Sequence, residues 1–159
     1  MNISCYVHVP FCARICTYCD FYRIVHDSEW EDRYVEAICT EIDLRFAGLI
    51  SKLSVDDRPI KLDTLYFGGG TPTVLSDRSW RKIVGRLKSQ INFTDNIEFT
   101  TEANPESSKP DKIELLHELG ANRISFGAQS FNSANLNRLG RLHNADEVDI
   151  AITTARSAR

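Results

Sequence analysis

The sequence has no apolar run of about 20 residues, the length that a helix needs to cross a bilayer. The strand-like segment "ISCYVHV" already begins at Ile3, so we expect no N-terminal targeting signal before it. Excess charge is also small, because 19 Lys and Arg against 22 Asp and Glu leave a net charge of −3. This balance argues against a general polyanion-binding surface, and we expect no nucleic-acid partner. These absences favour a cytoplasmic globular protein.

Five cysteines are present, and in a reducing compartment such residues are metal ligands or buried thiols more often than disulfide partners. Cys12, Cys16 and Cys19 lie on one short segment with the spacing C-x3-C-x2-C. Cys5 falls in a predicted strand and Cys39 in a predicted helix, so we expect buried structural thiols there. The three clustered cysteines are therefore the candidate metal ligands.

Short apolar runs alternate with longer amphipathic segments along the chain. We expect strands at residues 5–9, 62–68, 97–103 and 123–129, and a polar connection at residues 51–59. Four helix starts are marked by capping residues: Ser28 with Glu31, Ser76, Ser108 with Pro110, and Asn144 with Glu147. Gly120 is placed to end the third of these helices. The alternation predicts an α/β protein with about four successive βα units and a parallel sheet.

The unusual residues fall at the carboxyl ends of the predicted strands. The cysteines follow the first strand, the triple glycine at 68–70 follows the second, Glu102 with Asn104–Pro105 lies at the end of the third, and Gln129 closes the fourth. In barrels and open α/β sheets this edge carries the active site. We therefore expect one site built from all four loops.

The chain ends in a predicted helix that runs to Arg159 without a C-cap or a following strand. Four βα units form an arc rather than a closed barrel, which leaves the far edge of the fourth strand unpaired. We therefore expect the chain to be a fragment, or the first part of a longer protein.

Three cysteines leave two kinds of metal site open. A structural zinc site needs a fourth ligand, which His8 or His26 could supply, but the paired C-x-x-C spacing of zinc ribbons is missing. An iron–sulfur cube fits the count better, because three thiolates hold three irons and leave the fourth iron open to a small molecule.

The triple glycine in "YFGGGTPT" lies directly after the second predicted strand. Glycines there allow the backbone to approach a ligand and expose N–H and C=O groups to it. A Walker loop is excluded, because no G-K-[ST] follows. On this segment alone, a plain tight turn between strand and helix is the alternative.

The cysteine spacing, with aromatic Tyr18 before the last cysteine, resembles the signature of radical S-adenosylmethionine (SAM) proteins. Five segments together resemble the oxygen-independent coproporphyrinogen III oxidase family, and within it the HemW branch of heme chaperones: "YVHVPFCARICTYCDFY", "LYFGGGTPT", "TEANPE", "NRISFGAQSF" and "LGRLH". The resemblance implies a partial radical SAM (β/α) barrel, with residues 1–159 as the N-terminal part of the core domain. The remaining barrel strands and a C-terminal domain would be absent.

The resemblance also assigns site residues. It implies that Cys12, Cys16 and Cys19 hold a 4Fe–4S cluster whose open iron binds SAM. Tyr18 matches the aromatic residue packed near the cluster. The residues that match SAM contacts are Tyr6, Gly69, Gly70, Thr71, Glu102, Gln129 and Arg141. A carboxylate accepts hydrogen bonds from ribose hydroxyls and an arginine pairs bidentately with a carboxylate, which suits Glu102 and Arg141.

The implied function is that of a radical SAM heme chaperone, with heme as a further ligand and with an electron donor and a heme-acceptor protein as partners. Oxidases of the family have a further cysteine two residues after the last ligand, where this sequence has Phe21. This difference disfavours oxidative decarboxylation of coproporphyrinogen III, which stays as the alternative. A truncated, non-catalytic metal-binding remnant is the third interpretation. His143, within "LGRLH", has no chemistry assigned to it.

Overall fold

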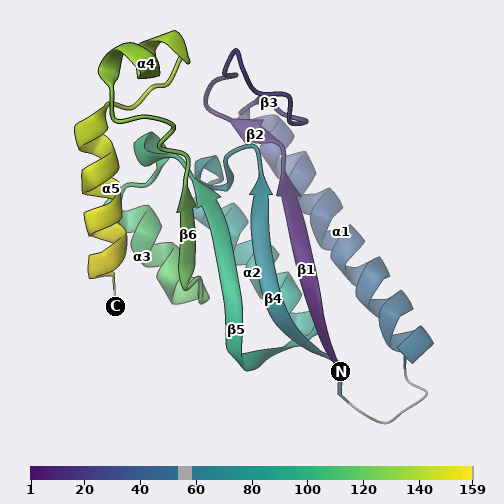
Figure 1. The fold of residues 1–159 in the computed structure, drawn as a ribbon. Coiled ribbons are helices and arrows are strands. Elements are labelled where there is room, and N and C mark those ends of the chain that lie inside the picture. The colour runs from purple at the N-terminus through teal and green to yellow at the C-terminus, as the bar shows by residue number, and fades with distance from the viewer. Residues whose placement is uncertain (54–58, 159) are drawn as a thin grey trace.

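Four parallel strands form the central sheet of the computed structural model, which describes residues 1–53 and 59–158. They are β1 (Asn2–Val9), β4 (Lys61–Gly69), β5 (Asn92–Ala103) and β6 (Arg123–Phe126), and they lie side by side in chain order (Figure 1). Two short strands, β2 (Phe11–Cys12) and β3 (Ile24–Val25), pair at the base of the cysteine loop. Parallel neighbours require a crossover between them, and these crossovers carry the helices.

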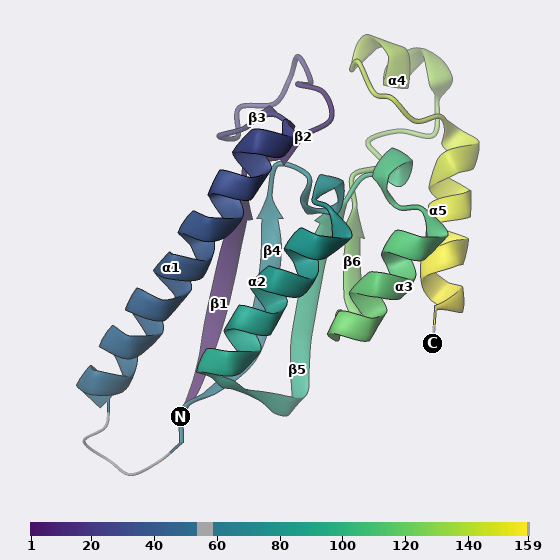
Figure 2. The ribbon, with the colours of Figure 1, turned by 180° about the vertical axis from the view of Figure 1, so that it is seen from behind.

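Helices cover one face of this sheet. The helices α1 (Ser28–Leu53), α2 (Asp77–Gln90) and α3 (Pro110–Leu119) lie side by side over the strands (Figure 2). Beyond β6 come α4 (Ser133–Arg138), near the cysteine loop end of the sheet, and α5 (Ala145–Ser157), which contacts α3. Two 3₁₀ turns, η2 (Pro72–Val74) and η3 (Pro105–Ser107), follow β4 and β5. The predicted α/β architecture with four successive βα units is confirmed.

The core lies between the sheet and its helices. Phe67 of β4 packs against Trp80 of α2, with 4.6 Å between ring centroids, and against Phe99 of β5 at 5.6 Å. All three side chains are fully buried. Because side chains alternate along a strand, Tyr66 lies on the opposite face of the sheet from Phe67. The same strands thus supply the core on one face and polar side chains on the other.

Three predicted helix boundaries are confirmed. Ser76 caps α2 by accepting a hydrogen bond from the amide of Ser79. Asn144 and Glu147 form the predicted capping box of α5. Gly120 ends α3 in the left-handed conformation, with φ of 104°, which a glycine adopts without steric cost.

The end of the fourth predicted strand and the predicted connection at residues 51–59 differ from the structure. The fourth strand ends at Phe126, before the predicted Gln129. Gln129 has φ of 63°, which is incompatible with a β-strand. The predicted connection at residues 51–59 begins too early, because α1 continues to Leu53, and residues 54–58 lie outside the described residues.

The predicted capping box of Ser28 and Glu31 is wrong. The amides of Glu29 and Trp30 donate to the side chain of Asp27 instead, at 2.9 and 3.1 Å. Asp27 therefore caps α1, and the carboxylate of Glu31 is free to bind elsewhere.

The Glu31 carboxylate joins α1 to the start of α2. Glu31 is 4% exposed, and its carboxylate accepts hydrogen bonds from the Ser76 amide at 2.9 Å and from the Ser79 hydroxyl. It also pairs with His26, at the base of the cysteine loop. Burial by itself raises the pKa of Glu31, but these hydrogen bonds outweigh burial and hold the pKa below its ordinary value.

Replacing Glu31 with glutamine is expected to lower the free energy of unfolding by about 1–3 kcal/mol near neutral pH. The amide oxygen can still accept from Ser76 and Ser79 but without the charge of a carboxylate, and the NH2 group that replaces the other oxygen cannot accept from His26. The lowered pKa means that the carboxylate stabilises the fold fully above the ordinary glutamate pKa, and that this stabilisation is lost as the pH falls through the folded-state value. Urea denaturation should therefore show that the difference in free energy of unfolding between variant and parent is smaller at acidic pH than at neutral pH.

Glu36→Gln is the control for Glu31→Gln. Glu36 lies on the same helix and pairs with Lys82 at the surface, so its replacement should change stability by less than about 0.5 kcal/mol. If Glu31→Gln lowered the free energy of unfolding equally at both pH values, the stabilising role of the charged Glu31 carboxylate would be contradicted.

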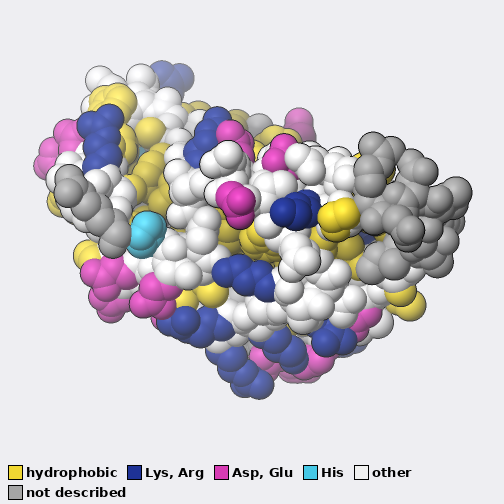
Figure 3. Space-filling model, turned by 90° about the horizontal axis from the view of Figure 1, so that it is seen from below, with side chains coloured by type: hydrophobic (Ala, Val, Ile, Leu, Met, Phe, Trp, Pro, Cys, Tyr) yellow, Lys and Arg dark blue, Asp and Glu magenta, His cyan; other side chains and the backbone are white. Residues whose placement is uncertain are grey.

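Charges of both signs are intermixed over the end of the molecule that lies opposite the strand carboxyl ends (Figure 3). On the helix layer, Arg81 pairs with Glu118 and Lys82 with Glu36.

Among residues 1–53 and 59–158, no helix is both long and apolar enough to cross a membrane.

Candidate functional site

The loops at the carboxyl ends of the four parallel strands surround one pocket of about 320 Å³. Every predicted site residue except Tyr6 lines it: Cys12, Cys16, Tyr18, Cys19, Gly69, Gly70, Thr71, Glu102, Gln129 and Arg141. The parallel topology brings these loops to one edge of the sheet. The volume lies in the range of small-molecule sites.

The cysteine loop forms the wall of the pocket on the β1 side. At its base β2 pairs with β3, and the His26 amide donates to the Cys12 carbonyl at 2.8 Å. Within the loop, the Arg23 guanidinium donates to the Cys16 carbonyl at 3.3 Å. Cys12 is buried, whereas Cys16 and Cys19 are half-buried, and all three are free thiols. The loop thus brings three thiols to one pocket.

Cys12 is tied to the glycine loop. The Thr71 hydroxyl donates to its Sγ at 3.5 Å. Burial raises the pKa of the Cys12 thiol, and the hydrogen bond from Thr71 lowers it in part. A donor of this kind orients a metal-ligating sulfur, so Thr71 supports Cys12 as a ligand.

The histidines that a zinc site would need are engaged elsewhere. His8 binds the Tyr6 hydroxyl through Nδ1 at 3.3 Å and the Tyr22 carbonyl through Nε2 at 3.1 Å, while His26 pairs with Glu31. Neither histidine lines the pocket. Across the described ranges, no three His, Cys, Asp or Glu side chains, the three loop cysteines included, are grouped tightly enough to hold a single metal ion. A 4Fe–4S cluster does not need that grouping, because each of its three thiolates binds a different iron. The zinc interpretation therefore lacks its fourth ligand.

The glycine loop joins the end of β4 to the base of the cysteine loop. The Gly70 amide donates to the Val9 carbonyl and the Thr71 amide to the Phe11 carbonyl, both at 2.7 Å. A Cβ on Gly70 would lie 2.6 Å from the Phe11 carbonyl oxygen, which leaves no room for a side chain. Gly69 has φ of 110°, a conformation that favours glycine. The loop is therefore built for close approach of backbone to backbone.

Glu102 is held by two donors. The Tyr66 hydroxyl donates to its Oε1 at 2.7 Å, and the Gly69 amide donates to its Oε2 at 3.1 Å. Burial and this hydrogen bond raise the pKa of Tyr66 to about 12, so the tyrosine stays a donor. Tyr6, outside the pocket, stacks on Tyr66 with 5.9 Å between ring centroids. The carboxylate is thereby oriented at the pocket wall.

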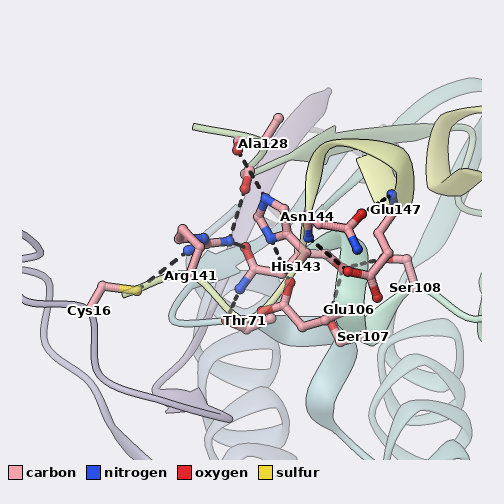
Figure 4. Close-up of polar contacts among 12 residues, drawn as sticks. Cys16, Thr71, Glu106, Ser107, Ser108, Ala128, Arg141, His143, Asn144 and Glu147 are labelled. Carbon is pink, nitrogen blue, oxygen red and sulfur yellow. Dashed lines mark hydrogen bonds and ion pairs between the residues drawn. The ribbon is translucent and has the colours of Figure 1, made fainter. Parts of the chain in front are cut away.

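Arg141 reaches across the pocket to the cysteine loop (Figure 4). Its Nη2 donates to the side chain of Asn104 at 2.5 Å and to the Gly127 carbonyl at 2.9 Å. Its Nη1 lies 3.5 Å from the Cys16 Sγ and 3.4 Å from the Tyr18 hydroxyl. Its Nε is buried and has no acceptor among the described residues. A fixed cation with one spare donor suits an anionic ligand.

Two residues of this site were given no role from the sequence, although Asn104 was expected at this edge of the sheet. Tyr66 orients Glu102, and Asn104 joins the two sides of the pocket by donating to Thr71 at 3.0 Å and accepting from Arg141. Asn104 lies within the quoted segment "TEANPE", two residues after Glu102, and this period of two was the available signal. Tyr66 gave no comparable signal in the sequence.

The two remaining cysteines lie away from the pocket. Cys39 is buried in the core, as predicted, whereas Cys5 is half-buried and packs against the core. Neither lines the pocket, so the candidate ligands stay limited to the cysteine loop.

The pocket fits the groups that the cysteine motif implies. Three thiols on one loop suit a 4Fe–4S cluster with one open iron. The glycine loop and Arg141 line the same pocket, and a guanidinium suits a carboxylate.

Comparisons with known proteins agree with this chemistry. The family model described as "Radical SAM superfamily" matches residues 6–159. The chain is 36% identical over 154 residues to "Heme chaperone HemW" of Bacillus subtilis, and 37% identical over 155 residues to the protein of that name from Haemophilus influenzae. These matches cover 96% and 97% of this chain, but only 38% and 39% of the relatives.

A solved structure extends the likeness to the fold. Coproporphyrinogen III oxidase (HemN) from Escherichia coli, described as a radical SAM enzyme, is similar with a TM-score of 0.86 at 27% identity. The similarity covers 98% of this chain and 34% of that protein. It confirms the partial radical SAM fold that the motifs predicted.

Proposed function

Because this chain belongs to the radical SAM superfamily, we propose that its pocket holds a 4Fe–4S cluster and SAM. The observation that supports this most strongly is convergence: the cysteine loop, the glycine loop, Glu102 and Arg141 line one pocket although they lie far apart in the sequence. Cys12, Cys16 and Cys19 would hold the cluster, which when bound supplies the electron for SAM cleavage.

The polar residues of the pocket bind and orient SAM. Glu102, held by Tyr66 and the Gly69 amide, accepts hydrogen bonds from the ribose hydroxyls. Arg141 would donate through its guanidinium to the methionine carboxylate. The Gly70 carbonyl would accept a hydrogen bond from the methionine amino group, because the Gly70 amide already donates to Val9.

The other predicted contacts complete the wall. Thr71 orients Cys12, and Tyr18 packs beside Arg141 at the cluster. Gln129 offers both a donor and an acceptor to SAM. Tyr6 acts from behind the pocket, through its contact with Tyr66.

We further propose that the whole protein acts in heme metabolism as a cytoplasmic, HemW-like heme chaperone. Similarity to two proteins named heme chaperones supports this proposal. So does Phe21, which is 68% exposed, lines the pocket and stands where oxidases have a further cysteine. Heme, an electron donor and a heme-acceptor protein would be its partners.

The second candidate is an oxygen-independent coproporphyrinogen III oxidase, which the similarity to HemN favours. A substrate for this reaction would enter the same pocket, since the open iron and SAM lie there. A non-catalytic metal-binding protein, with the three thiols of the cysteine loop as ligands, is a third candidate.

An anaerobic assay separates the three functions. The full chain is reconstituted with iron and sulfide, then titrated with SAM and heme, and incubated with SAM, a reductant and coproporphyrinogen III. We expect equal iron and sulfide contents, saturable binding of SAM and heme, and no protoporphyrinogen IX. Formation of protoporphyrinogen IX would overturn the chaperone proposal in favour of the oxidase. Zinc without sulfide would support the third candidate.

A further inference from the structure

Residues 104–106 and residues 141–143 are joined by two side-chain contacts at the pocket wall (Figure 4). Asn104 accepts a hydrogen bond from Arg141 at 2.5 Å, and two residues further along each segment, Glu106 binds His143 at 2.9 Å. The first pair lines the pocket, whereas Glu106 and His143 do not. The second pair, the Glu106–His143 brace, thus lies directly behind the first.

His143 is anchored at both ring nitrogens. Its side chain is completely buried, with Nδ1 on the Glu106 carboxylate and Nε2 on the Ala128 carbonyl at 3.0 Å. The two partners, a carboxylate and a backbone carbonyl, hold the ring from opposite sides. The ring therefore bridges η3 to the loop after β6.

The Ala128 carbonyl belongs to a tight, unfavourable turn. It also accepts a hydrogen bond from the Ser130 amide at 2.7 Å, and the residue between them, Gln129, has φ of 63°. This is a γ-turn with a positive φ at its centre, which is rare and strained for a non-glycine residue. Such a conformation persists only where the surrounding structure holds it.

We propose that Glu106 and His143 are positioning residues that hold this turn, so that Gln129 and Arg141 keep their places at the pocket. His143 fixes the turn through Ala128, and Glu106 fixes the ring of His143. This gives a role to the ends of the segments "TEANPE" and "LGRLH". The consequence for SAM affinity rests on the proposed function, whereas the structural role of the brace does not.

Amide hydrogen exchange of the full chain tests the structural role without any ligand. His143→Leu should speed exchange of the Ser130 amide by about tenfold or more, because the turn loses its anchor. Glu106→Gln, which keeps the shape of the side chain, should act in the same direction with a smaller effect. Glu147→Gln is the matched control: it removes a carboxylate charge from the neighbouring capping box, which glutamine can still form, and should leave Ser130 unchanged. Wild-type exchange at Ser130 in both brace variants would overturn the proposal.

SAM affinity tests the consequence. In the full chain with a reconstituted cluster, we expect Glu106→Gln and His143→Leu to weaken SAM binding about tenfold, as supporting residues around a bound group do. Their iron and sulfide contents should equal those of the parent protein and of Glu147→Gln. Equal SAM affinity in the brace variants and the parent would overturn the positioning role. If the parent itself binds no SAM, the proposed function fails while the exchange result still decides the structural role.

Discussion

Cys16→Ala is expected to lose the iron–sulfur cluster completely. The proposed cluster is held by three cysteine thiolates, and the variant keeps only two of them. Cys16 lies in the pocket wall with its Sγ 3.5 Å from Nη1 of Arg141, and no other cysteine lines the pocket besides Cys12 and Cys19. Iron and sulfide contents and the broad visible absorption after anaerobic reconstitution should fall to background.

Cys39→Ala is the matched control for this loss. Cys39 is a buried cysteine of α1 and lies outside the pocket, so the variant should reconstitute as the parent protein does. A full cluster in Cys16→Ala would contradict the ligand assignment, and so would loss of the cluster in a folded Cys39→Ala.

Gly70→Ala is expected to destabilise the fold by about 2–3 kcal/mol and to reduce cluster loading. An added Cβ would lie 2.6 Å from the Phe11 carbonyl oxygen and 2.9 Å from that of Val9, and backbone atoms of neighbouring strands and loops cannot move aside cheaply. The shift needed would break the 2.7 Å hydrogen bond from the Gly70 amide to Val9. Urea denaturation and iron content after reconstitution measure the two effects.

The same chemical change in α2 should have the opposite effect. A Cβ on Gly85 would meet no atom within 4 Å, and alanine favours a helix over glycine by about 1 kcal/mol, so Gly85→Ala should stabilise the protein by about that amount. If Gly70→Ala were as stable as Gly85→Ala, the close approach of the glycine loop to β1 would be refuted.

Features that depend on neighbouring residues could be predicted from the sequence. Ser76, Gly120 and the Asn144–Glu147 box end or start helices as expected, because their bonds join residues three or four positions apart. Glu31 carried the same kind of signal and the prediction failed. Its carboxylate binds Ser76 and Ser79, which lie 45 and 48 residues away, and no local pattern reports such partners.

In the candidate site too, local motifs could be predicted from the sequence, whereas contacts between distant residues could not. The cysteine spacing and the glycine loop identified most of the pocket wall, because each is a short motif at the end of a strand. The roles of Tyr66 and Asn104 were missed, because they arise only when β4, β5 and the loop after β6 lie together. His143 stood in a quoted segment, but its partners could not be read from that segment.

By itself, the sequence determined that three thiols share one short segment, that three glycines follow a strand, and that both lie at the carboxyl ends of parallel strands. These are properties of consecutive residues and of their period. Only the tertiary structure decided that Tyr66 holds Glu102 across 36 residues, and that Glu106 holds His143 across 37. Both bonds depend on the register and packing of separate βα units, which the order of residues within any one unit does not specify.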